Sequence, residues 1–147
     1  PLVGATARRA GTLFVERGNR RSGARVLLEM VAELERGEGI IIFPEGTTFE
    51  GDEVRPFRLG AFTAARRSGA EIVPLGLAYE GAAATFGDET FLAHMARVGR
   101  APITRCAVVV GAPIDVAGLE ATALERLVHA RVQALVHEAR AALGAPS

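Results

Sequence analysis

The chain has no lysine and no tryptophan, a single cysteine and only 5% aromatic residues. One cysteine excludes a disulfide framework, and the position of Cys106 before the apolar run 107–110 favours a buried strand residue over a nucleophile. No apolar run approaches the ~20 residues that span a bilayer as a helix, and no signal peptide is visible. The 17 basic residues, all arginine, balance 17 acidic ones, so net charge alone indicates no partner. What remains is a globular composition with 147 residues, enough for one domain with a sizeable core.

Short apolar runs alternate with helical patterns along the chain. The runs predict strands at residues 12–15, 40–43, 72–79 and 103–111. Apolar residues at helical spacing predict helices from Ser22 to about Gly37, from about 58 to 67, near 90–97, and from about 122 onward. Continuous apolar strands are typical of sheets covered on both faces. The pattern therefore predicts an α/β fold with a mainly parallel sheet flanked by helices, forming one domain over residues 1–147.

Two polar loops follow the first two predicted strands, at residues 16–23 and 44–51. Ligands of parallel α/β sheets bind beyond the carboxyl ends of strands, so both loops would open on one edge. Six arginines and one acid lie between residues 8 and 25, and four arginines and no acid between 55 and 67. Arginine binds phosphate through a planar, bidentate fork, and the helix start at Ser22 favours an anion. The sequence thus predicts a phosphate-binding edge, with a solvated arginine surface as an equally good alternative. Scarce aromatics and zero net charge disfavour nucleic acid as a partner.

Glu45 follows a predicted buried strand and stands between Pro44 and Gly46, which make a stiff turn. From there its carboxylate could accept hydrogen bonds from substrate hydroxyls or orient an arginine. A surface carboxylate without function is the alternative, and it is favoured when the loop is considered alone.

The three histidines give no catalytic signal. His94, His129 and His137 lie in helical patterns and none has an acid five positions later, so surface or packing roles are favoured. No metal-ligand cluster, Gly-rich nucleotide loop or serine-hydrolase motif is present, and we expect no metal and no cofactor.

Several motifs, in order, resemble the 1-acylglycerol-3-phosphate acyltransferase family. The segments that carry the resemblance are Phe14-Val15-Glu16-Arg17 (a Phe-x-x-Arg), Phe43-Pro44-Glu45-Gly46-Thr47, Pro56-Phe57-Arg58-Leu59-Gly60 (with Arg58 where the family usually has lysine) and Ile72-Val73-Pro74-Leu75. Residues 87–91 and 110–114 also look like later features of the family. Each segment alone is weak, but the ordered set covers nearly the whole chain. The resemblance implies a glycerolipid acyltransferase-like fold and acyl transfer from an acyl-CoA or acyl-carrier-protein thioester to a hydroxyl of lysophosphatidic acid or a related glycerolipid.

The resemblance also implies roles for individual residues. The acceptor lipid and its phosphate would be bound by Arg17, Glu45, Gly46, Thr47 and Arg58, and the pocket would be shaped by Phe14, Pro44 and Pro74. The family's catalytic His-x-x-x-x-Asp, in which the histidine is the general base, has no counterpart in the 13 residues before Phe14. We therefore expect it upstream of residue 1, with the domain incomplete at its N-terminus and the chain inactive by itself.

Two other functions remain open at this stage. One is a non-catalytic lipid- or phosphate-binding module that keeps only the acceptor pocket. The other, more distant, is a phosphoester-handling α/β enzyme, which would need a carboxylate cluster for metal that the sequence does not show. For the acyltransferase, the expected partners are a lysophospholipid acceptor, an acyl-CoA or acyl-carrier protein and a membrane surface, with attachment at the cytoplasmic face of the cell membrane.

Overall fold

The computed structural model describes residues 12–13, 20–47, 51–81, 89–100 and 102–144. Its elements, in chain order, are α2 (Arg20–Glu35), α3 (Gly60–Ser68), β1 (Leu75–Tyr79), α4 (Phe91–Arg100), β2 (Cys106–Val110) and α5 (Ala121–Gly144). All four predicted helices are confirmed. Their signals are local in the chain: apolar residues recur at helical spacing, and glycines at 37 and 69, both with positive φ, follow the ends of α2 and α3.

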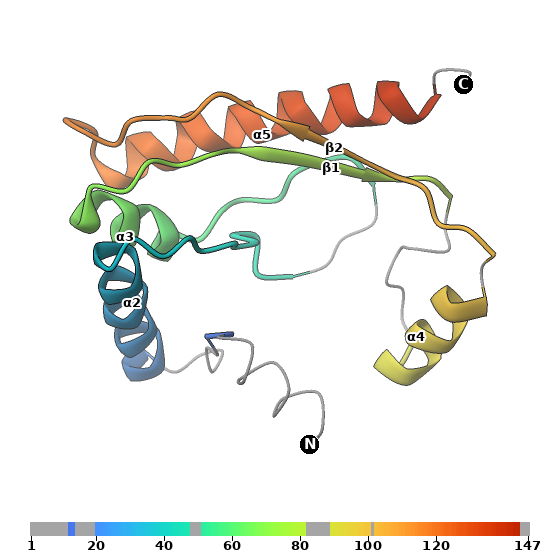
Figure 1. The fold of residues 1–147 in the computed structure, drawn as a ribbon, viewed down its shortest axis with the longest axis horizontal. Helices are drawn as coiled ribbons and strands as arrows, with labels where there is room; N and C mark the ends of the chain where they lie inside the picture. The colour runs from blue at the N-terminus through green and yellow to red at the C-terminus, as the bar shows by residue number, and fades with distance from the viewer. Residues whose placement is uncertain (1–11, 14–19, 48–50, 82–88, 101, 145–147) are drawn as a thin grey trace.

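The long helix α5 lies along both strands and covers one face of them (Figure 1). The other helices are placed around this unit: α3 also packs against α5 and α2 packs against α3, whereas α4 lies toward the opposite end of the strands (Figure 1). The core sits where α3 and α5 meet and includes Phe62, Val116, Leu124 and Val128. A second apolar cluster joins Val26 and Met30 of α2 to Ala64 of α3.

The predicted direction of the sheet is wrong for the strand pair that the structure describes. β1 and β2 pair antiparallel, with Leu75 opposite Val110 and Tyr79 opposite Cys106, and a further bridge joins Ile72 to Ile114. The chain leaves β1 and enters β2 at the same end of the pair, so no crossover carries it back to start a parallel strand. The two runs do form strands as predicted, but apolar content does not encode their direction.

Only one face of the strand pair is covered by α5. Gly76 faces this helix so closely that a Cβ added to it would overlap the backbone of Leu135. Residues on the other face are open: Val108 is 55% exposed and Val110 is 64% exposed. Cys106, on that same open face, is also exposed, so its predicted burial is wrong. The continuous valine run therefore does not mark burial on both faces in this pair.

The other two predicted strands have different outcomes. Residues 40–43 have no regular secondary structure, and Ile41 and Phe43 are 83% and 73% exposed, so the strand prediction is wrong for them. No ladder partner for this segment occurs in the ranges that the structure describes. Of the predicted strand 12–15, residues 14 and 15 lie outside those ranges.

Candidate functional site

The Phe43–Gly46 turn is built by local sequence. The Gly46 N–H donates to the Phe43 carbonyl at 3.1 Å, which closes a turn with Pro44 at its second position. Proline presets φ there, and Gly46 adopts a φ of 67°, which a side chain would strain. The turn presents the side chain of Glu45 from a fixed piece of backbone.

The segment before α3 lies against this turn. The Arg55 backbone N–H donates to Glu45 Oε2 at 2.8 Å, and the Arg58 N–H donates to the Pro44 carbonyl at 2.9 Å. The Arg58 side chain lies so close to Gly46 that a Cβ there would be 2.5 Å from its Nε. The structure thus brings together the predicted residues Glu45, Gly46 and Arg58. Arg58 is exposed and forms no salt bridge with any carboxylate that the structure describes.

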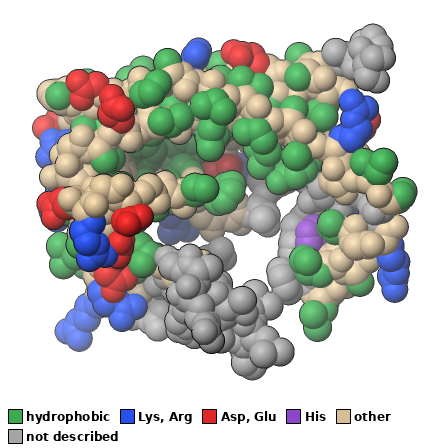
Figure 2. Space-filling model, in the orientation of Figure 1, with side chains coloured by type: hydrophobic (Ala, Val, Ile, Leu, Met, Phe, Trp, Pro, Cys, Tyr) green, Lys and Arg blue, Asp and Glu red, His purple; other side chains and the backbone are tan. Residues whose placement is uncertain are grey.

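A large apolar cavity of about 990 Å³ adjoins the turn. Its wall includes the predicted residues Pro44, Glu45, Thr47 and Pro74, together with apolar side chains from residues 40–43, from β1 and from α5. In the space-filling view, hydrophobic side chains border the hollow on this face of the molecule (Figure 2). A carboxylate beside an apolar cavity suits a ligand with a polar head and a hydrocarbon chain.

Two further predicted residues cannot be placed. Phe14 and Arg17 lie outside the described residues, so whether Arg17 shares an edge with Glu45 stays a prediction.

His94 has the acidic partner that the sequence search missed. Its Nδ1 lies 3.0 Å from Glu89 Oε1, and Arg97 pairs with the same carboxylate. The spacing considered in the sequence puts the acid five positions after the histidine, whereas Glu89 stands five positions before His94. The Arg97 guanidinium, helped by His94, lowers the pKa of Glu89 to about 2, so this carboxylate is ionised at neutral pH. Arg97 Nη2 also lies 3.2 Å from His94 Nδ1, so the three side chains form one polar cluster, and His94 lines the large cavity.

Acid should weaken this cluster. The pKa of Glu89 falls from 4.5 to about 2 on folding, so the folded state binds the proton more weakly than the unfolded chain. Pairing therefore stabilises the fold above pH 4.5, and this contribution is lost as pH falls toward 2. We expect Glu89→Gln and Arg97→Met each to flatten the pH dependence of the free energy of unfolding in this window, measured by denaturant titration. Unchanged slopes in both variants would contradict the assignment.

A second carboxylate, that of Asp52, lines the same large cavity as Glu45. Arg140 Nε and Nη2 donate to the two oxygens of Asp52, each at 2.8 Å, and this pairing lowers the pKa of Asp52. Neither residue was singled out by sequence reasoning, because 88 positions separate them and no local spacing connects them.

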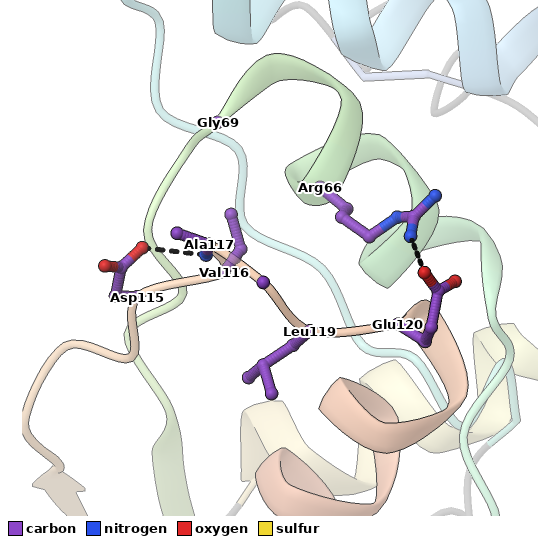
Figure 3. A pocket seen from close by; sticks show the side chains of 8 residues that line it. Arg66, Gly69, Asp115, Val116, Ala117, Leu119 and Glu120 are labelled. Carbon is purple, nitrogen blue, oxygen red and sulfur yellow. Dashed lines mark hydrogen bonds and ion pairs between the residues drawn. The ribbon is translucent and has the colours of Figure 1, made fainter.

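A smaller cavity of about 290 Å³ lies between the end of α3 and the start of α5 (Figure 3). Its charged side chains are already engaged: Arg66 pairs with Glu120 at 2.7 Å, and Asp115 Oδ1 accepts from the Ala117 N–H at 2.9 Å. No predicted site residue lines it, so it is not part of the candidate site.

No group of three or more His, Cys, Asp or Glu side chains among the described residues could hold a metal ion. Among the helices in the described ranges, none combines the length and apolar character needed to cross a membrane.

Comparison with known proteins identifies the family. The family model described as Acyltransferase matches residues 1–78, just over half of the 147. The chain therefore belongs to the acyltransferase family, and the predicted resemblance is confirmed.

Curated relatives are similar over parts of their length. The chain is 33% identical over 133 residues to the lyso-ornithine lipid O-acyltransferase of Pseudomonas aeruginosa, covering 86% of this chain and 51% of the relative. It is 32% identical over 79 residues to the 1-acyl-sn-glycerol-3-phosphate acyltransferase of Neisseria gonorrhoeae, covering 54% and 31%. The chain thus spans about half the length of the Pseudomonas aeruginosa relative, and its match to the Neisseria gonorrhoeae relative covers a smaller share, 31%, of that protein.

A solved structure shares the fold. The crystal structure of the 1-acyl-sn-glycerophosphate acyltransferase PlsC from Thermotoga maritima matches 96% of this chain and 52% of its own, with a TM-score of 0.68 and 22% identity. This likeness confirms the predicted α/β, glycerolipid acyltransferase-like fold class, with the correction to strand direction described above.

Proposed function

We propose that the protein containing this chain transfers an acyl group from an acyl-CoA or acyl-carrier-protein thioester to a hydroxyl of lysophosphatidic acid or a related lysolipid. The observation that carries the proposal is the Glu45 turn, with Arg58 laid against it, in the wall of a large apolar cavity. The names of the relatives, acyltransferases for a lysophosphatidate and for a lyso-ornithine lipid, support the same class of reaction.

Each part of the site has a role in this proposal. Arg17 and Arg58 bind the acceptor phosphate, while Glu45, held by the Arg55 N–H, accepts a hydrogen bond from an acceptor hydroxyl. The apolar cavity takes hydrocarbon, and Pro44 and Pro74 shape its wall. The reaction needs a general base to take the proton of the attacking hydroxyl. In this proposal the base is a histidine oriented by an aspartate, the pair that the family resemblance implies.

The acceptor is a membrane lipid, so the reaction takes place at a membrane surface, which we propose is the cytoplasmic face. Exposed Ile41, ahead of the turn, and Phe43, its first residue, are apolar groups that could enter the edge of a bilayer. A full-length protein that does not sediment with anionic phospholipid vesicles at low salt would contradict this part.

Replacing Arg17 tests phosphate recognition. In the full-length protein, Arg17→Ala should lower kcat/KM for lysophosphatidic acid about ten- to hundred-fold, mainly through acceptor KM, because a charged hydrogen bond contributes ~1.5–3 kcal/mol. Arg17→Lys should recover only part of the loss, since the bidentate fork is missing. The measurement is thioester consumption at varied acceptor concentration.

Arg126→Ala is the matched control, because this arginine is exposed on α5 and lines neither cavity. Normal kinetics in both Arg17 variants would remove Arg17 from the site. A wild-type protein that binds lysophosphatidic acid but consumes no thioester would instead support a non-catalytic lipid-binding module.

A further inference from the structure

One face of α5 carries a row of polar side chains that point at the segment following the Glu45 turn. His129, Gln133, His137 and Arg140 follow one another at spacings of four, four and three, so they share one face of the helix. Neither the sequence motifs nor the proposed chemistry uses these residues. Three of them, His129, Gln133 and Arg140, hydrogen-bond that segment, and His137 contacts Gln133 at 3.0 Å.

Gln133 binds the backbone of this segment in two directions. Its Oε1 accepts from the Val54 N–H at 2.8 Å, and its Nε2 donates to the Asp52 carbonyl at 2.8 Å. The side-chain amide thereby satisfies one backbone N–H and one backbone carbonyl in a segment that forms no helix or strand. His129 adds a third bond, from Nε2 to the Val54 carbonyl at 3.1 Å, and its ring packs edge-on against Phe57 at 4.9 Å between centroids.

Arg140 binds the same segment at a side chain, the carboxylate of Asp52. Besides its two bonds to the Asp52 carboxylate, Arg140 donates from Nη1 to the Tyr79 carbonyl at 2.7 Å. This guanidinium therefore ties three elements together: α5, the end of β1 and the loop. A bidentate pair also fixes direction, which a single contact would not.

Residues 52–55, which α5 binds, also contact Glu45. Arg55 follows Val54 in the chain, and its N–H makes the 2.8 Å bond to Glu45 Oε2. We infer that Gln133 and Arg140 are positioning residues of the acceptor site, which act through residues 52–55 to hold the Glu45 carboxylate in place. The expected effect on acylation kinetics rests on the proposed function, whereas the expected ordering of residues 52–55 does not.

Hydrogen exchange in the full-length protein tests the structural consequence. We expect Gln133→Leu and Arg140→Ala to raise the exchange rates of the Val54 and Arg55 amides at least tenfold while amides in β1 stay protected. Arg131→Ala, at an exposed arginine of the same helix, is the control and should leave them unchanged. Unchanged exchange at both amides in both variants would overturn the inference, whatever reaction the protein performs.

A double-mutant cycle with Glu45→Ala tests the kinetic consequence. Gln133→Leu should lower kcat/KM for the lysolipid about tenfold, with the KM for the acyl thioester unchanged. If Gln133 acts through Glu45, the same substitution should cost less than about twofold when Glu45 is already alanine. Equal losses on both backgrounds would show a merely structural role and overturn the positioning of Glu45.

The failure of the proposed function looks different from the failure of this inference. A wild-type protein that acylates no lysolipid contradicts the proposed function, and the exchange experiment then decides the inference alone. An active wild type whose Gln133→Leu and Arg140→Ala variants have normal acceptor kinetics contradicts the inference and leaves the proposed function standing.

Discussion

Leu124→Ala is expected to lower the free energy of unfolding by about 2–5 kcal/mol. Leu124 has no exposed surface and lies in the cluster with Phe62, Val116 and Val128, where α3 meets α5. Removing three carbons there loses the transfer free energy of the side chain and leaves a cavity that the surrounding backbone fills only in part. Because stability is typically 5–15 kcal/mol, this single change removes a large share of it.

Leu127→Ala on the same helix is the matched control. Leu127 is 49% exposed, so its truncation should change the free energy of unfolding by no more than about 0.5 kcal/mol. Denaturant unfolding of the full-length protein, followed by circular dichroism, measures both variants. Equal destabilisation at the two positions would mean that the α3–α5 cluster is not the core.

Gly76→Ala is expected to cost about 3 kcal/mol or more, at the upper end of overpacking effects. The added Cβ would overlap the Leu135 carbonyl and the Val136 nitrogen, which are backbone atoms in the middle of α5 and cannot rotate away. The helix would have to move off the strand, which would also disturb the polar face of α5 and the segment it binds. Thermal unfolding and the soluble yield of the full-length protein measure the effect.

Gly39→Ala provides the comparison, since nothing lies within 4 Å of a Cβ there. That position is exposed and its backbone is not left-handed, so stability should change little. Gly76→Ala with wild-type stability would show that α5 does not contact β1 as closely as described.

Sequence reasoning predicted some residues of the candidate site and missed others. It found Glu45, Gly46 and Arg58 through motif resemblance, and the structure places these three together. It missed Asp52, Gln133 and Arg140, because their contacts join residues about 80 positions apart and no local spacing connects the partners. It also dismissed His94, because the pairing acid was sought on the wrong side of the histidine.

The sequence by itself determined the helices and the shape of the turn. Apolar spacing defined α2 and α5, and Pro44 with Gly46 set the turn, because these signals act within a few residues of the chain. Only the tertiary structure decided that β1 and β2 run antiparallel and that α5 covers one face of them. It alone also showed that Gln133 binds the loop whose next amide holds Glu45. Such contacts depend on where the chain returns in space, and an amphipathic pattern fixes which side of a helix is buried without specifying what its polar side will meet.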